Sequence, residues 1–379
     1  MDSGGQVDAI FTDYSKAFDR IDHSLLLEKL YLAGIHGSLF RWFSSYIENR
    51  SQAVVLNGFS SAWCQVPSGV PQGSLLGPLL FNIFINDISS CFQHSQFLLY
   101  ADDMKIFRTI KNLTDCNLLQ EDLDRFAEYC HNNKLDLNVS KCSSMTFSRS
   151  NKPIQFSYKL KAQVLVKVTE VRDLGVIHDT KLTYNKHLDY IINKANRSLG
   201  FICRVSSEFS NIKTIKILYC SYVRSSLEYC SQVWNPQYLI YVNRLESIQK
   251  RFIKHLQFKC KTYDSSYESR ARRFHLLPLF ERRRIADIVS LLKIAQNKID
   301  SPLLLSKIYL KVPSRSSRIP SLLYTPFSST NYRKNSFLIR TSKEINKLND
   351  IPELDFDLFN TSVDVLKRIM TRHWFDAIS

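Results

Sequence analysis

The chain is organised around the stretch Phe97-Leu98-Leu99-Tyr100-Ala101-Asp102-Asp103-Met104-Lys105-Ile106-Phe107. Two adjacent aspartates separate two apolar runs, each rich in strand formers and too short for a helix. The pattern predicts a β-hairpin with Asp102 and Asp103 at its tip. Burying a carboxylate is costly unless a partner compensates its charge. The pair therefore indicates either a site for Mg²⁺, which prefers oxygen ligands, or a turn with solvated aspartates.

A third aspartate, Asp13, ends a strand predicted at residues 7–13 from the alternation of its side chains. The three carboxylates can meet if both strands belong to one antiparallel sheet. Such a set would bind two divalent ions roughly 4 Å apart, the arrangement that activates an attacking oxygen and stabilises a leaving one in phosphoryl transfer. The spacing thus predicts a metal site made from distant parts of the chain.

Between these carboxylates lies the loop Pro67-Ser68-Gly69-Val70-Pro71-Gln72-Gly73-Ser74. Its two prolines and two glycines predict a rigid loop with exposed N–H groups, in which Ser74 caps an apolar helix over residues 75–88. A helix N-terminus beside a glycine is suited to bind phosphate. An ordinary junction between a loop and a helix has the same pattern, and this loop alone does not separate the two interpretations.

Periodicity and turn residues predict the remaining elements. Helices are expected at residues 23–33, from residue 38, and at 114–133, 185–206, 211–231, 238–257, 264–274, 280–297 and 358–370. Strands are expected at residues 143–147, and as pairs at 53–56 with 59–66 and at 164–169 with 173–177. The chain therefore begins as a mixture of strands and helices and continues as helices.

The charge of the chain is unevenly distributed. The net charge is +16, but residues 1–110 carry 7 Lys and Arg against 10 Asp and Glu, whereas residues 111–379 carry 44 against 25. An acidic site region joined to a basic remainder indicates a polyanionic partner, although a merely soluble basic protein is the alternative. The basic side chains of the predicted helices, notably Arg270, Arg272, Arg273 and Arg282–Arg284, could equally form solvated faces.

The nine cysteines form neither a CxxC pair nor a Cys/His cluster with zinc spacing. They lie among large apolar residues, as in a reduced intracellular protein, and we expect the nucleus or the cytoplasm. The first residues lack the basic region and apolar core of a signal peptide. No apolar run approaches the ~18 residues that span a membrane. We therefore expect no membrane partner.

Three segments extend these features: Asp13-Tyr14-Ser15-Lys16-Ala17-Phe18-Asp19, Gly69–Ser74 with Gly77-Pro78, and Tyr100-Ala101-Asp102-Asp103. Together they resemble motifs A, B and C of reverse transcriptases, and most closely those of animal non-LTR (LINE-type) retrotransposons. Residues 138–141 resemble the lysine-bearing motif D, and Asp173-Leu174-Gly175-Val176 resembles the primer-grip motif E. Residues 224–236, 244–251 and 279–284 resemble helical segments typical of these elements.

The resemblance implies roles for the matching residues. Asp13, Asp102 and Asp103, with the backbone carbonyl of Tyr14, would hold two Mg²⁺ ions, for which Mn²⁺ substitutes. Phe18 would be the aromatic gate that excludes a ribose 2′-OH, and Gln72 and Gly73 would pack against the incoming nucleotide. Lys141 would lie near the triphosphate, and Leu174 and Gly175 would support the primer end. Arg282, Arg283 and Arg284 would contact the nucleic-acid backbone.

The implied fold is α+β. An antiparallel sheet with helices on one face would form a polymerase palm at residues 1–180, followed by a helical thumb at 181–300 and a C-terminal linker and helices at 301–379. Several hundred residues, including the fingers, normally precede motif A in this family. Here motif A begins about a dozen residues from Met1, so the chain resembles a truncated copy that binds primer–template and extends it poorly.

The implied function is RNA-directed DNA polymerase. Its partners would be an RNA template, a DNA primer and dNTPs, without a small-molecule cofactor. A catalytically inactive fragment that only binds nucleic acid is the alternative. A two-metal nuclease has little support, because no water-activating histidine accompanies the three aspartates.

Overall fold

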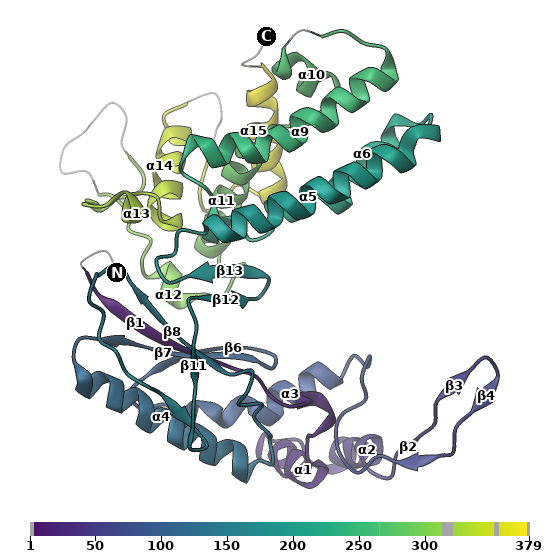
Figure 1. The fold of residues 1–379 in the computed structure, drawn as a ribbon, viewed down its shortest axis with the longest axis vertical. Coiled ribbons are helices and arrows are strands. Elements are labelled where there is room, and N and C mark those ends of the chain that lie inside the picture. Colours follow the sequence, from purple (N-terminus) through teal and green to yellow (C-terminus); the bar gives the residue numbers. More distant parts are fainter. Residues whose placement is uncertain (1–3, 265, 313–320, 352–355, 377–379) are drawn as a thin grey trace. The chain divides into compact units, whose positions relative to one another are not determined.

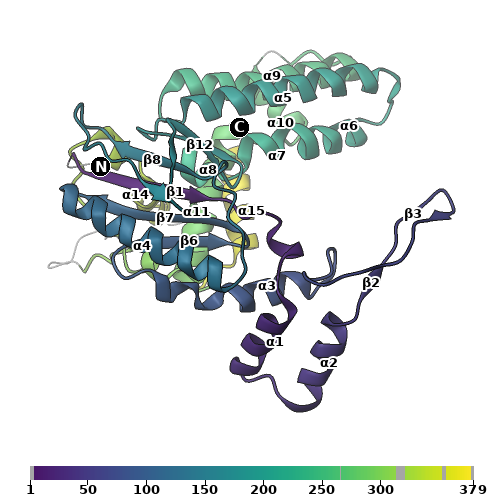
Figure 2. The same ribbon diagram turned by 60° about the horizontal axis from the view of Figure 1, so that its bottom comes forward.

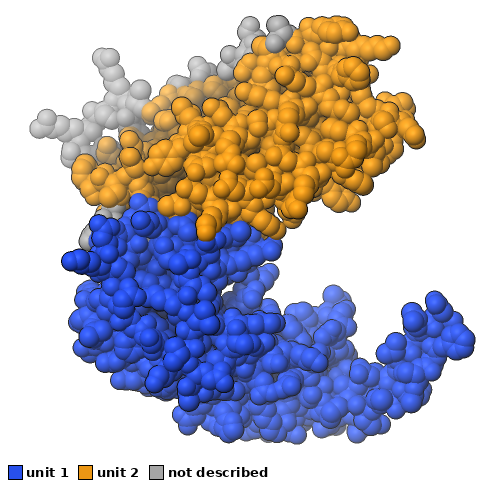
Figure 3. Space-filling view, viewed as in Figure 1, with its two compact units in different colours: residues 1, 3–182 blue, residues 2, 183–379 orange. Residues whose placement is uncertain are grey.

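The structure, a computed structural model, describes residues 4–264, 266–312, 321–351 and 356–376. The chain divides into two compact units, residues 3–182 and residues 183–379 (Figure 3). Unit 1 mixes strands and helices, and unit 2 is helical in its described part. The predicted mixture of sheet and helix is therefore confirmed.

A five-stranded sheet organises unit 1, in the order β11-β8-β1-β7-β6 (Figure 1). Its strands are β1 (Gln6–Thr12), β6 (Gln96–Tyr100), β7 (Asp103–Ile110), β8 (Ser143–Ser148) and β11 (Val166–Lys167). The central strand β1 is antiparallel to both neighbours, and β11 alone runs parallel to its neighbour β8. Asp8 of β1 is only 2% exposed and accepts hydrogen bonds from Gln6 and Tyr158, as a buried carboxylate requires.

Helices enclose the apolar core of unit 1, and α4 runs along one face of the sheet (Figure 1). They are α1 (His23–Leu32), α2 (Gly37–Ile47), α3 (Gly77–Ile85) and α4 (Leu113–Asn132), with 3₁₀ turns at Ala17–Asp19 and Asn86–Cys91. Asp22 and Asn112 cap α1 and α4 by accepting hydrogen bonds from backbone N–H groups of the first turn, as short polar side chains commonly do. These caps begin the helices close to the predicted residues.

Four small ladders complete unit 1. They are β2 (Ser51–Gln52) with β5 (Cys64–Gln65), β3 (Val55–Leu56) with β4 (Phe59–Ser60), β9 (Lys159–Leu160) with β10 (Gln163–Val164), and β12 (Glu170–Asp173) with β13 (Val176–Asp179). The first two form an arm that extends from α2 (Figure 2). Asn57 and Gly58 turn this arm with positive φ angles, as predicted for an Asn-Gly hairpin.

One predicted strand pairing is wrong. Residues 164–169 do not pair with residues 173–177, because β11 joins β8 whereas β12 pairs with β13. Leu174 and Gly175 connect β12 to β13 and have φ angles of 44° and 87°. A two-residue turn with positive φ at both positions matches the twist of a tight hairpin. The Leu174-Gly175 turn therefore connects β12 to β13 within one hairpin, and residues 164–169 are not part of that hairpin.

Helices form unit 2. They are α5 (Asn185–Val205), α6 (Ile212–Tyr219), α7 (Ser225–Glu228), α8 (Ser231–Trp234), α9 (Leu239–Cys260), α10 (Tyr267–Arg273), α11 (Leu279–Ala295), α12 (Pro302–Leu305), α13 (Asn331–Lys334), α14 (Phe337–Asn349) and α15 (Val363–Asp376), with a 3₁₀ turn at Ser206–Glu208 and a π-helical turn at Cys220–Arg224. Apolar side chains of α11, α14 and α15 share one core. Within the described residues, no helix has the length and hydropathy to span a membrane.

Candidate active site

The register of the central strands brings Asp13 and Asp103 together. Thr12, the last residue of β1, pairs with Met104 of β7. The next position on each strand therefore places Asp13 opposite Asp103. Asp102 lies in the turn between β6 and β7, which is closed by the pair Tyr100–Asp103. The three predicted carboxylates thus lie at one end of the sheet: Asp102 and Asp103 at the tip of the β6–β7 hairpin, and Asp13 just after the neighbouring strand β1.

Like charges surround Asp103. Burial raises the pKa of Asp103, the charges of Asp102, Asp173 and Asp13 raise it further, and Lys105 lowers it. Carboxylates that share a partly desolvated site disfavour each other's ionised form. A divalent cation would relieve this repulsion, so the site is electrostatically prepared for positive charge.

A loop after α4 holds the backbone at Asp13. The N–H of Asp13 donates to the Cys142 sulfur at 3.4 Å, and its carbonyl accepts from the N–H of Asn138 at 2.8 Å. The Lys141 ammonium lies 3.7 Å from the Asp13 carboxylate. Tyr14 follows with its side chain 5% exposed and forms a β-bridge to Leu137. The backbone position of Asp13 is therefore set by residues about 125 positions further along the chain.

The donor chemistry of this site fits a hard divalent cation, because carboxylate and carbonyl oxygens are the ligands that Mg²⁺ prefers. The side-chain arrangement is not closed around an ion. Across the described ranges, no three His, Cys, Asp or Glu side chains form a group that could hold a metal. The Asp13 carboxylate lies 3.7 Å from the Lys141 ammonium and near enough to Asp103 for its charge to raise the pKa of that carboxylate.

Phe18 and the loop at residues 67–74 form a second part of the site. The Phe18 ring packs on Phe81 of α3, with 4.6 Å between ring centroids. The loop returns to the segment around Phe18, because the N–H of Val70 donates to the Phe18 carbonyl at 2.9 Å. The Gln72 amide donates to the Asp19 carboxylate at 2.6 Å. The predicted nucleotide-binding residues Phe18 and Gln72 therefore belong to neighbouring segments.

Gly69 makes this approach possible. Its φ angle is +84°, and a Cβ atom there would lie 2.6 Å from the Asp19 carbonyl oxygen. No other residue tolerates both the left-handed backbone and this contact. Gly73 also has a positive φ, +78°, but a Cβ atom there would meet open space. Ser74 does act at the helix start, since it accepts from the N–H of Gly77 at 2.9 Å, and α3 begins at Gly77.

The three arginines predicted to contact a nucleic-acid backbone are engaged inside unit 2. Arg282 forms a double hydrogen bond with Glu228, and Arg284 pairs with Glu344 and Glu281. Arg283 is 1% exposed, and burial lowers its pKa to about 10. A charged group buried among helices cannot reach a phosphate. The prediction for Arg283 is therefore wrong, and Arg282 and Arg284 serve as internal ion-pair partners.

Two residues near the carboxylates had no predicted role. Lys105 of β7 donates a hydrogen bond to the Asp173 carboxylate of β12. Both residues stand inside quoted motifs, Lys105 two positions after Asp103 and Asp173 directly before the Leu174-Gly175 turn. Their pairing depends on how two separate hairpins pack, so local sequence pattern carries no signal for it.

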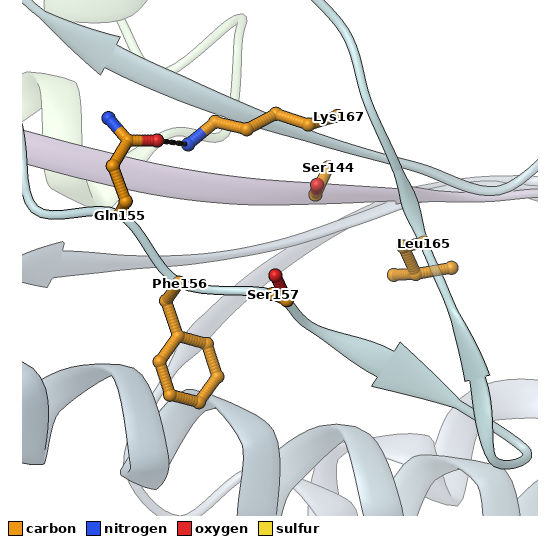
Figure 4. Close-up of a pocket in the computed structure, with 6 residues that line it drawn as sticks. All are labelled: Ser144, Gln155, Phe156, Ser157, Leu165 and Lys167. Carbon is orange, nitrogen blue, oxygen red and sulfur yellow. Dashed lines mark hydrogen bonds between the residues drawn. The ribbon is translucent and has the colours of Figure 1, made fainter.

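A cavity of about 300 Å³ lies elsewhere in unit 1. It is lined by Ser144, Gln155, Phe156, Ser157, Leu165 and Lys167 (Figure 4). Lys167 donates to the Gln155 side chain at 2.8 Å, so its charge is partly engaged. None of the predicted site residues lines this cavity.

The chain is similar in sequence to several RNA-directed DNA polymerases of mobile elements. The family described as reverse transcriptase (RNA-dependent DNA polymerase) matches residues 3–178. The RNA-directed DNA polymerase from mobile element jockey of Drosophila funebris is 28% identical over 255 residues, 64% of this chain and 28% of that protein. The probable RNA-directed DNA polymerase from transposon X-element of Drosophila melanogaster is 26% identical over 260 residues, 66% of this chain and 28% of that protein.

Solved structures include a more distant match. Apo telomerase from Candida tropicalis is 13% identical, with a TM-score of 0.38, and the match covers 71% of this chain and 45% of that one. The chain spans 28% of the length of the curated relatives named above.

Proposed function

Because residues 3–178 belong to the reverse transcriptase family, we propose that this chain carries the polymerase palm of a LINE-type retrotransposon. The enzyme would join a dNTP to the 3′-OH of a DNA primer along an RNA template and release pyrophosphate. The helices of residues 181–300 would form the thumb, and residues 301–379 a C-terminal extension. The observation that carries the proposal is the meeting of Asp13 with Asp102 and Asp103 at one end of the sheet.

The three aspartates and the Tyr14 carbonyl would hold two divalent cations, Mg²⁺ or Mn²⁺. When bound, these would activate the primer 3′-OH and stabilise the leaving pyrophosphate. The protein's own contribution is to fix the carboxylates in place. Asp13 is held through both backbone hydrogen bonds to the 138–142 loop. Asp103 is held by the strand pairing of β7.

Phe18 would select deoxyribonucleotides. Its ring packs on Phe81, and this support would hold it in place as a wall against a 2′-OH. Gln72 and Gly73 would line the other side of the nucleotide. The hydrogen bond between Gln72 and Asp19 supports this assignment, because it links the loop to the segment that carries Phe18.

Lys141 would act on the triphosphate of the incoming nucleotide, and the Leu174-Gly175 turn would act on the primer. Lys141 lies 3.7 Å from the Asp13 carboxylate, a position from which an ammonium group could meet the triphosphate and donate a proton to pyrophosphate. The Leu174-Gly175 turn would support the primer. Asp173, its neighbour in the chain, lies near enough to Asp103 to raise the pKa of that carboxylate.

In unit 2, cations other than the arginines of α11 are exposed and could contact the phosphates of a nucleic-acid duplex. Lys194, Arg197 and Arg204 of α5 are exposed, together with Phe201. Their spacing of three, four and three residues places them on one face of the helix. We name this set the α5 stripe. Exposed cations on one helix face can follow a phosphate backbone.

Primer extension tests the proposed function. The purified chain is given an RNA template with an annealed DNA primer and one dNTP, with Mg²⁺ or Mn²⁺. We expect the wild type to incorporate nucleotide and Asp102→Asn to lose incorporation. Binding of primer–template without incorporation above the Asp102→Asn variant, with either metal, would establish the binding-only alternative.

A further inference from the structure

An ion pair connects two hairpins of unit 1. Lys105 lies on β7, two residues after Asp103, and donates to the carboxylate of Asp173, the last residue of β12. The two side chains are 27% and 15% exposed. Removing one partner from a pair this shielded from water leaves an uncompensated charge. Removing one partner of this pair should therefore cost more than removing one partner of an ordinary surface ion pair.

The β12–β13 hairpin is attached to the sheet by such contacts. It forms a ladder of its own and is not a strand of the five-stranded sheet. Near its other end, the N–H of Ser148 on β8 donates to the Thr180 carbonyl at 3.1 Å. Lys105 and Ser148 thus attach the hairpin region to the sheet at separate points. The Lys105 contact is the one beside the Leu174-Gly175 turn.

We propose that the Lys105–Asp173 pair positions the Leu174-Gly175 turn relative to the carboxylates at the β6–β7 turn, and so places the primer 3′ end for reaction. The proposal rests on the proposed polymerase function. Lys105 is two residues from Asp103, and Asp173 is adjacent to Leu174. The pair is therefore a short mechanical connection between the segment that would hold the primer and the segment that would hold the metal ions.

The alternative role for the pair is electrostatic. Lys105 and Asp173 carry opposite charges near Asp103 and could act only by adjusting the charge of the metal site. The two roles predict different patterns. Neutralising either partner breaks a positioning contact in the same way. Purely electrostatic action instead requires Lys105→Met and Asp173→Asn to change the affinity for Mn²⁺ in opposite directions, because one removes a positive and the other a negative charge.

The experiment compares Lys105→Met, Asp173→Asn, Lys105→Asp, Asp173→Lys and the double variant Lys105→Asp/Asp173→Lys. Lys152→Met, an exposed lysine in the loop after β8, is the matched control. The measurements are KM for primer–template, KM for the dNTP, the Kd for Mn²⁺, and hydrogen-exchange protection of the amides of residues 170–179.

We expect each single variant to raise KM for primer–template by about tenfold, in line with coupling energies of contacting residues. KM for the dNTP should stay within about twofold, hairpin protection should fall, and the double variant should restore primer KM and protection. Lys152→Met should match the wild type. Opposite shifts of Mn²⁺ affinity in the two neutral variants, or a double variant no better than the singles, would overturn the proposal.

Failure of the proposed function has a different signature. It appears as absence of extension by the wild type. Hydrogen exchange then still tests whether the Lys105–Asp173 pair connects the two hairpins. Loss of protection in Lys105→Asp and in Asp173→Lys, with recovery in the double variant, supports this connection. Unchanged protection in all variants overturns it.

Discussion

At the scale of single residues, the site is dominated by repulsion between carboxylates. Burial and three neighbouring negative charges raise the pKa of Asp103, which means that the folded chain holds a proton there more tightly than an unfolded chain would. This term therefore favours the folded state at low pH and is lost as pH rises through the raised pKa. At neutral pH, holding Asp103 ionised beside the other carboxylates is unfavourable, and a bound cation would offset this cost.

The first prediction concerns metal binding. Calorimetric titration with Mn²⁺ at neutral pH should show binding to the wild type, and Asp102→Asn should abolish it. Protons compete with the metal for Asp103, so the affinity for Mn²⁺ should fall as the pH is lowered. Because the pKa of Asp103 is raised, this fall should begin at a higher pH than it would for an ordinary aspartate. Asp124→Asn, on the exposed face of α4, is the control and should bind as the wild type does. Equal binding by wild type and Asp102→Asn would contradict the assignment.

A second prediction at this scale concerns Phe18. Its ring is supported by Phe81, so Phe18→Ala should remove the wall against a 2′-OH and leave use of dNTPs largely intact. We expect the preference for dNTP over rNTP, as a ratio of kcat/KM values, to fall by about tenfold or more. Phe59→Ala, on the exposed tip of the β3–β4 arm, should leave the ratio unchanged. A variant that rejects rNTPs as strongly as the wild type does would show that another residue is the gate.

At the scale of elements, tight backbone approaches position the site. Two turns beside it carry non-glycine residues with positive φ, Ala101 at 52° and Leu174 at 44°. Such conformations cost of order 1 kcal/mol or more and persist only where surrounding contacts impose them. Both turns follow strands whose pairing is fixed by register. The sheet and the β12–β13 hairpin therefore fix the two turns, which carry the candidate site residues Asp102, Leu174 and Gly175.

The third prediction concerns the loop before α3. Gly69→Ala should lower the free energy of unfolding by about 3 kcal/mol, because the new methyl group meets the Asp19 backbone and the left-handed φ is strained. Gly34→Ala is the matched control, since Gly34 also has a positive φ, +91°, but open space around it. Its cost should be about 1 kcal/mol. Urea denaturation measures both, and equal losses would mean that the Asp19 contact adds nothing.

At the scale of the whole molecule, charge is segregated along the chain. The first 110 residues are net acidic, and the remainder has an excess of 19 positive charges. A basic helical region binds polyanions through counterion release, with little dependence on base sequence. Which cations take part is decided by exposure, and the α5 stripe is exposed whereas Arg283 is not.

The fourth prediction tests the α5 stripe. The affinity of the wild type for a DNA duplex should fall with salt, and replacing Lys194, Arg197 and Arg204 with Gln should reduce the slope of log K against log salt by up to ~2.7, or ~0.9 per lost phosphate contact. Preference among duplex sequences should not change. The control triple variant replaces the exposed Lys298, Lys307 and Lys311 with Gln and removes the same charge. If both triple variants reduce the slope equally, the stripe is not the interface.

Elements that depend on neighbouring residues along the chain could be predicted from the sequence. Alternating residues predicted β1, and two short apolar runs around Asp102 and Asp103 predicted the β6–β7 hairpin. Asn57-Gly58 predicted the turn between β3 and β4, and helical periodicity predicted α1, α4, α5 and α9 close to their observed bounds. The motifs carried by those elements also identified the reverse transcriptase family. These features were accessible because backbone preference and the period of apolar residues are local properties.

Contacts between residues far apart in the chain became visible only in the folded structure. It set the register that places Asp13 opposite Asp103, paired β11 (residues 166–167) with β8, and paired Lys105 with Asp173. It also buried Arg283, for which the family resemblance had implied a contact with the nucleic-acid backbone. Register, pairing and burial arise from packing between segments far apart in the chain. The sequence gives the number of cationic side chains, but packing determines which of them are exposed to water.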